Sequence, residues 1–203
     1  MKNSVLVLMC AATLMACKKN ETTSTESNTD SSMMAVPADS AMAMDSTTMS
    51  GMGDNQAGNL SEQDKMFANE AAKGGLTEAM LGQLGADNGT NAKVKSHGQM
   101  MVSDHTKANE ELKSWAASAG YTLPAAPDAA QQKIAEDLRA KKGAEFDRAY
   151  TDIMVSEHEK AINLFRKQST DGSDAALKAF ATKTLPTLEQ HLQHTKEARD
   201  AVK

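Results

Sequence analysis

The chain has 203 residues, a formal net charge of −5 at pH 7 and only 3% aromatic residues. This length accommodates one domain of ordinary size with extensions. Much of its apolar content is Ala, Leu and Met, which favours helices packed through small and unbranched side chains over β-sheets. Because the sequence contains no long basic run, it argues against a nucleic acid as partner.

The N-terminal segment resembles a bacterial lipoprotein leader. Lys2 supplies the positive charge, and the apolar stretch 5–14 is too short to cross a bilayer as a helix. The string Leu14-Met15-Ala16-Cys17 resembles the lipobox, so we predict a signal peptide over residues 1–16 and lipidation of the Cys17 thiol. Cys10 is rejected as the lipidated residue because it would leave almost no apolar segment. The alternative is an ordinary secretory signal with an incidental cysteine.

A lipid anchor at Cys17 fixes the expected location of the protein. Several acyl chains on one residue give stable membrane anchoring, whereas a single chain binds only marginally. With Cys10 removed in the leader, no cysteine remains to form a disulfide in the folded part. We therefore expect a bacterial envelope lipoprotein held at the outer membrane, with its domain in the periplasm or at the surface.

Residues 17–60 are predicted to form a lipidated, disordered tether. The segment 18–60 has no Phe, Trp or Tyr and is rich in Ser, Thr, Ala, Met and acidic residues, so it cannot bury enough apolar surface to fold. Clustered thioethers suit Cu(I), although drift in an unconstrained linker is the favoured explanation for the methionines here. The cluster comprises Met33, Met34, Met42, Met44, Met49 and Met52.

From Ser61 onward the apolar residues recur at helical spacing. The pattern and its caps predict helices over 62–87, 91–119, 128–167 and 174–201. We expect a kink near Gly143 in the third helix and another at Pro186 in the fourth. Two short turns and one longer connection between these helices predict an all-α, antiparallel four-helix bundle over residues 61–203.

Each predicted helix carries one ionisable residue on its apolar stripe, and a buried polar group needs a partner. The strings Met101-Val-Ser-Asp-His105 and Met154-Val-Ser-Glu-His158 echo each other, with Met and His on one helix face. Imidazole suits Cu, Zn or Fe, and the two methionines favour copper. The pattern predicts a transition-metal site built from Glu78, Met101, His105, Met154, His158 and His191.

Depth along the bundle leaves two arrangements open. Counting from the turns at a rise of 1.5 Å per residue, Glu78 and His105 differ in depth by about 7–8 Å, and His158 and His191 by about 10 Å. Errors in helix boundaries are of similar size, so the four groups form either one layer or two separate pairs. The competing hypothesis is a non-catalytic envelope module, with hydrogen-bonded core histidines, that binds a partner.

Four further polar residues lie close to the predicted site in the sequence. His97 and His194 are interpreted as surface or boundary residues, although His97 is placed where it would extend the site. Asp104 and Glu157 lie about 100° round the helix from the neighbouring histidines. They are predicted to face solvent or to orient an imidazole from outside.

Several chemistries lack their motifs. There is no Cys-x-x-Cys-His string for covalent haem, no Gly-rich phosphate loop and no Gly-x-Ser-x-Gly elbow. Glu-x-x-His, which the di-iron bundle site needs twice, does not occur. The sequence therefore disfavours a ferroxidase-type centre and favours a binding protein over an enzyme.

Four strings in the predicted domain resemble one bacterial family of unknown function, over about residues 61–200. Its members are commonly labelled as outer membrane proteins and grouped with ferritin-like bundles. The resemblance implies a ferritin-like fold and an envelope location, and it places Glu78 and the three stripe histidines on motif positions. The strings are Phe67-x-x-x-Ala71-Ala-x-Gly74-Gly-Leu-x-Glu78, Met101-Val-x-Asp-His105 with Ala108-Asn-x-Glu-Leu112, Phe146-Asp-Arg-Ala-Tyr150 to His158, and Leu185-Pro-Thr-Leu-x-x-His191-Leu.

Overall fold

The computed structural model describes residues 60–203, which form an all-α domain. The predicted leader, Cys17 and the methionine-rich tether lie outside these residues. None of the described helices is long and apolar enough to span a membrane. The five helices are α1 (Glu62–Asn88), α2 (Ala92–Ala119), α3 (Ala129–Arg139), α4 (Gly143–Asp171) and α5 (Ala175–Asp200).

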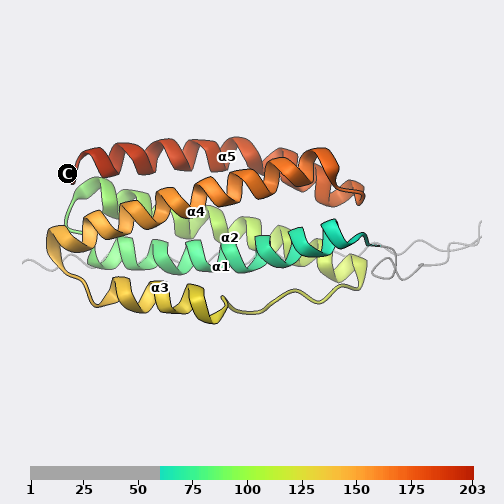
Figure 1. The fold of residues 1–203 in the computed structure, drawn as a ribbon, viewed down its shortest axis with the longest axis horizontal. Coiled ribbons are helices and arrows are strands. Elements are labelled where there is room, and N and C mark those ends of the chain that lie inside the picture. Colours follow the sequence, from blue (N-terminus) through green and yellow to red (C-terminus); the bar gives the residue numbers. More distant parts are fainter. Residues whose placement is uncertain (1–59) are drawn as a thin grey trace, which may run out of the picture. The chain divides into compact units, whose positions relative to one another are not determined.

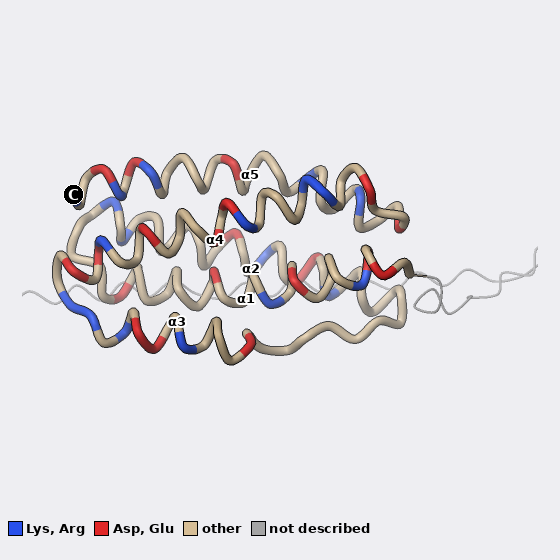
Figure 2. Tube along the Cα trace, in the orientation of Figure 1, with Lys and Arg blue, Asp and Glu red and all other residues tan. Residues whose placement is uncertain are grey.

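Four long helices pack antiparallel around a shared core. α1 and α2 form one helical hairpin, α4 and α5 form a second, and the hairpins meet through α1 against α4 and α2 against α5 (Figure 1). The short α3 lies outside this set, alongside α1 and α4. Lysine and arginine are interspersed with acidic residues along all the helices (Figure 2), as expected for solvated helix faces.

The prediction of a single third helix with a kink is wrong. Asp128 does cap a helix, with Gln131 completing a capping box, but this helix ends at Arg139. Gly143 then adopts φ 58° and begins α4, which runs back along α3 (Figure 1). Because only glycine adopts the left-handed conformation without steric cost, Gly143 permits a complete chain reversal here.

The other three helices begin and end within one residue of their predicted bounds. α5 continues as a single helix past Pro186.

The core consists of two apolar clusters with a polar layer between them. Glu78, His105 and His158 each lie between residues of the two clusters along their own helices, and His191 joins them from α5, next to Leu188 of the cluster that contains Phe67. One cluster is centred on Phe67, Leu112, Phe165, Leu177 and Phe180, and the other on Leu81, Met101, Phe146, Tyr150 and Met154.

Two buried aspartates join the hairpins at opposite ends of the bundle. Asp64 of α1 accepts hydrogen bonds from the backbone N–H of Ser173 (3.1 Å) and Asp174 (3.2 Å), in the α4–α5 turn. Asp147 of α4 accepts from the backbone N–H of Thr90 (2.9 Å) and Asn91 (2.8 Å), in the α1–α2 turn. Each hairpin thus holds the turn of the other.

The charge of Asp64 is stabilised in the folded state. Burial alone would raise the pKa of its carboxyl group, but hydrogen bonds from Ser61, Gln168 and the two backbone N–H groups outweigh burial and lower the pKa. Asp64 is fully buried, and Gln168 Nε2 donates to it at 2.6 Å. These donors lose their acceptor if the carboxylate is removed.

We expect Asp64→Ala to lower the free energy of unfolding by about 3 kcal/mol, because it leaves several donors without an acceptor at a buried position. Urea unfolding followed by helical circular dichroism measures the change. Asp152→Ala, at an exposed position of α4, is the control and should change stability by less than about 0.5 kcal/mol. Equal stability of the two variants would contradict this account.

Candidate metal centre

Three buried histidines converge in the polar layer. His105 comes from α2, His158 from α4 and His191 from α5, and one ring nitrogen of each lies within 4.8 Å of one from each of the others. The ring centroids are 5.3 Å (His105–His191), 5.4 Å (His158–His191) and 5.8 Å (His105–His158) apart. The rings therefore form a nearly equilateral triangle, with one side chain from each of three helices.

Glu78 of α1 completes the layer from the fourth long helix. Its Oε2 lies 3.4 Å from His105 Nδ1, and its Oε1 lies 3.4 Å from His158 Nδ1. Only 3% of Glu78 is exposed to solvent. The structure thus brings all four stripe residues into one layer and excludes the arrangement as two separate pairs.

Each histidine has a polar neighbour at one ring nitrogen, which orients its ring. His158 Nδ1 donates to the backbone carbonyl of Met154 at 2.9 Å. His191 Nε2 lies 3.1 Å from Asp104 Oδ2, so Asp104 orients an imidazole from outside, as predicted. His105 Nδ1 faces Glu78. Metal-binding histidines in proteins are held in this way, through a carboxylate or carbonyl on the nitrogen that does not bind the metal.

The remaining ring nitrogens have no hydrogen-bond partner. The unpartnered buried atoms are His105 Nε2, His158 Nε2 and His191 Nδ1, together with Glu78 Oε1. Within residues 60–203, Arg199 Nε is the only other buried side-chain nitrogen or oxygen without a hydrogen-bond partner. Each such atom costs on the order of 1–3 kcal/mol when it is buried without a partner. A metal ion bound to the three nitrogens would remove this cost, so the donor set fits a transition metal.

Burial keeps the imidazoles neutral. It lowers the pKa of His105 well below the usual value and that of His158 to about 4, and it also lowers the pKa of His191. Burial raises the pKa of Glu78 to about 8, and the nearby charge of Glu157 adds to this. Since neutral imidazole is the form that binds metals, the histidines need not lose protons to do so at neutral pH.

Met101 and Met154 lie one helical turn from His105 and His158, as the repeated string predicts. Both side chains are fully buried in the apolar cluster that contains Tyr150. Met154 also contributes its backbone carbonyl, which accepts from His158. Coordination of a metal by either thioether stays a prediction.

The interpretation of His97 as a surface or boundary residue is wrong. Only 3% of it is exposed; Tyr150 Oη lies 2.8 Å from its Nδ1 and Thr195 Oγ1 lies 2.7 Å from its Nε2. Thr195 in turn donates to the backbone carbonyl of His191 at 2.7 Å. His97 therefore supports the centre through hydrogen bonds and has no free nitrogen. Its position four residues before Met101 on the apolar stripe was the sequence signal that could have predicted its burial.

The side chain of His194 is 42% exposed, at the edge of the bundle as predicted.

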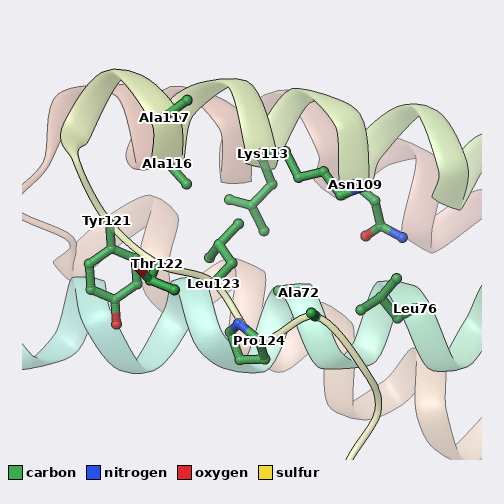
Figure 3. A pocket seen from close by; sticks show the side chains of 12 residues that line it. Ala72, Leu76, Asn109, Lys113, Ala116, Ala117, Tyr121, Thr122, Leu123 and Pro124 are labelled. Atoms are coloured by element: carbon green, nitrogen blue, oxygen red, sulfur yellow. The ribbon is translucent and has the colours of Figure 1, made fainter.

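An apolar groove lies apart from this layer. It lies between α1, α2 and the connection that follows α2, with a volume of about 360 Å³ (Figure 3). Leu76, Leu112, Ala116, Tyr121 and Leu123 are among its lining residues. None of the four polar-layer residues lines this groove.

The buried histidines predict a steep acid dependence of stability. Burial lowers the pKa of His97 to about 3 and that of His158 to about 4, so below pH 6.5 the unfolded chain takes up protons that the folded domain does not. Their stabilisation is complete above pH 6.5 and is lost as the pH falls. Glu78 acts in the opposite sense, because its raised pKa makes the folded domain hold an extra proton between about pH 4.5 and 8.

In acid, unfolding lets the four buried histidines (His97, His105, His158 and His191) take up more protons than Glu78 releases. The domain therefore loses stability as the pH falls. We expect the free energy of unfolding without metal to fall by about 5 kcal/mol between pH 6.5 and 5, because about three net protons act at about 1.4 kcal/mol per pH unit each and the unfolded imidazoles are already half protonated at pH 6.5. Urea unfolding in the presence of a chelator measures this difference. An unchanged midpoint would show that these imidazoles are not held neutral.

The fold and the layer together define an all-helical domain with a buried three-histidine cluster that can hold a metal ion. The chain belongs to the family described as a domain of unknown function, DUF4142, whose model matches residues 50–198. Neither the search of curated proteins nor that of solved structures found a match. The predicted resemblance to a family of unknown function is thereby confirmed, while the ferritin-like grouping and the outer-membrane label stay predictions.

Proposed function

We propose that this domain binds one transition-metal ion through His105 Nε2, His158 Nε2 and His191 Nδ1. One observation carries the proposal: these buried nitrogens are unpartnered, while the opposite nitrogen of each ring faces Glu78, the Met154 carbonyl or Asp104. A fully hydrogen-bonded structural histidine, such as His97, has both nitrogens satisfied. The difference between His97 and the other three distinguishes a supporting histidine from a ligand.

Glu78 is assigned a positioning role in this proposal. Its oxygens lie beside the Nδ1 atoms of His105 and His158, and the unpartnered nitrogens of both rings are Nε2. Glu78 Oε2, 3.4 Å from His105 Nδ1, therefore favours the tautomer that leaves Nε2 free. Glu78, which the sequence pattern predicts to be a ligand, is proposed instead to orient the ligand His105 from outside the coordination sphere.

Copper is the proposed metal, ahead of zinc and iron. Three imidazoles suit all three metals, and Cu²⁺ binds such sites most tightly among the divalent first-row ions. Met101 and Met154, one turn away, would add soft donors for Cu(I). The bundle carries one mononuclear centre in this proposal, since the Glu-x-x-His pairs of a di-iron site do not occur.

The proposed setting is the bacterial envelope, with the domain anchored through Cys17 as a ferritin-like, metal-binding lipoprotein. The lipobox-like string and the tether composition support this location. Antiparallel long helices with inward-facing donors support the ferritin-like grouping. We infer a role in metal binding, storage or stress tolerance, and no catalytic step is assigned.

Metal titration of the full chain tests the proposal. Cys10→Ser and Cys17→Ser remove the thiols, and Cu(II), Zn(II) and Fe(II) are added against a competing chromophoric chelator. We expect one tight equivalent of metal that is lost when His105, His158 and His191 are all replaced by alanine. A Met33, Met34, Met42, Met44, Met49 and Met52 to leucine variant should keep this equivalent.

The competing proposal is a partner-binding module with structural histidines, for which the apolar groove of Figure 3 is the available surface. Absence of tight metal binding, or binding that survives the loss of the three histidines, would favour that alternative. Glu78→Gln distinguishes a positioning role from a ligand role. A positioning role predicts a 10- to 100-fold loss of affinity with the same metal–nitrogen ligation.

A further inference from the structure

An acidic groove leads from the surface to the buried layer. It runs between α1, α3 and α4, has a volume of about 380 Å³, and includes Glu78 among its lining residues. Three carboxylates, the Glu78 carboxyl group and one ammonium group line it, namely Glu70, Asp128, Glu157, Glu78 and Lys160. A cleft lined mainly by negative charge concentrates cations.

Glu78 connects this groove to the histidines. It is the groove residue that also lies 3.4 Å from His105 and His158, and its Oε1 is buried without a hydrogen-bond partner. The other carboxylates near the mouth already have lysine partners. Glu157 pairs with Lys160 at 2.7 Å, and Lys73 lies 2.6 Å from Glu70 and 3.6 Å from Asp128. Glu78, the innermost of these acidic residues, is therefore the one with an oxygen free to receive a cation.

Gly74 keeps the wall of the groove open. It lines the groove from the middle of α1, and a Cβ added there would meet nothing within 4 Å. Close packing does not require glycine at this position, in contrast to Gly82 and Gly98, where an added Cβ would overlap the neighbouring helix. Glycine is unfavourable inside a helix, so its presence beside an open groove points to a need for space.

A second groove, between α2 and α5, is the other route to consider. It is lined by His97, His194 and Glu197 among others, with a volume of about 200 Å³. Its buried end is His97, both of whose ring nitrogens are hydrogen-bonded. It offers an incoming cation no free donor atom.

From these observations we propose that the metal cation reaches the histidines through the groove between α1, α3 and α4, with Glu78 as its last transient ligand. This inference rests on the proposed function, and it adds the path and the residues that govern the rate of loading. Glu70, Asp128 and Glu157 attract the cation, and Gly74 leaves it room to pass. In the final step the arriving cation displaces the proton of the Glu78 carboxyl group to solvent, and Glu78 takes up a proton again when the ion moves on to the ring nitrogens.

Stopped-flow loading of the full chain with Co(II), followed by its visible absorption, tests the route. Gly74→Met places a side chain in the groove, and Gly74→Ala is the matched control that changes the helix backbone equally. We expect all three proteins to bind one equivalent at equilibrium. Gly74→Ala should load at the wild-type rate or close to it, and Gly74→Met at least about tenfold more slowly. Loading of Gly74→Met at the wild-type rate would overturn the route while leaving the metal site intact.

A substitution that removes a charge from the groove tests the same route if Gly74→Met fails to fold. Glu157 and Glu110 are both mid-helix glutamates paired with a lysine three residues on, at 2.7 and 2.9 Å, but only Glu157 lines the groove. Glu157→Gln should slow loading severalfold and weaken its dependence on salt, whereas Glu110→Gln should change neither. Equal rates for the two variants would overturn the route. Wild-type protein that binds no metal at equilibrium would instead overturn the proposed function, and the route with it.

Discussion

His158→Ala is expected to lower the affinity for the bound metal at least about 100-fold. Replacing a residue that merely orients a ligand typically costs 10- to 100-fold, so removing one of three direct ligands should cost at least the upper end of that range. His158 is fully buried, and its ring is held by the Met154 carbonyl at 2.9 Å. No other described imidazole can replace it in the layer, because the nitrogens of His97 are already hydrogen-bonded and His194 lies on the surface of α5.

Competition with a chelator of known affinity measures this loss. His194→Ala is the control, because His194 lies on the surface of α5 and should leave the affinity unchanged. Circular dichroism of His158→Ala without metal checks that the helices persist. Unchanged affinity in a folded His158→Ala variant would remove His158 from the ligand set.

Gly98→Ala is expected to lower the free energy of unfolding by about 3 kcal/mol or more, the upper range for overpacking a close contact. A Cβ at this position would lie 2.4 Å from Ala86 N, 2.5 Å from Gly82 O and 2.8 Å from Gly85 C. All three atoms belong to the backbone of α1, so no side-chain rotation relieves the overlap. The two helices must separate, which also moves His105 on α2 away from Glu78 on α1.

Gly74→Ala is the matched control for this prediction, because it makes the same substitution on α1 with open space around the new Cβ. It should stabilise the domain by up to about 1 kcal/mol, since alanine favours the helix interior more than glycine does. Urea unfolding of both variants measures the two changes. Equal and small effects would contradict the close α1–α2 contact.

Much of the site could be predicted from the sequence, because helical periodicity determines which residues face the core. Glu78, His105, His158 and His191 stand on apolar stripes, and the structure buries all of them. Their common depth could not be predicted. Residue counts from a turn measure distance along one helix, and they ignore the inclination of the helices and the reach of Glu and His side chains.

The break between α3 and α4 was also beyond the sequence pattern. Both segments have helical periodicity, and Gly143 is as compatible with a kink as with a reversal. Only packing against α1 and α4 decides that α3 folds back.

The role of His97 depends on Tyr150 and Thr195, which other helices supply from more than 50 residues away. The same holds for Asp64, whose acceptor role for the distant α4–α5 turn no local motif indicates.

Anomalous scattering from crystals of the copper-loaded full chain would locate the metal directly. We expect a single copper peak in the polar layer at about 2.0–2.1 Å from His105 Nε2, His158 Nε2 and His191 Nδ1, distances typical of metal–imidazole bonds. Glu78 and Asp104 should remain on the outer nitrogens of His105 and His191. Copper located elsewhere on the chain, with the three nitrogens unbound in the loaded protein, would contradict the account.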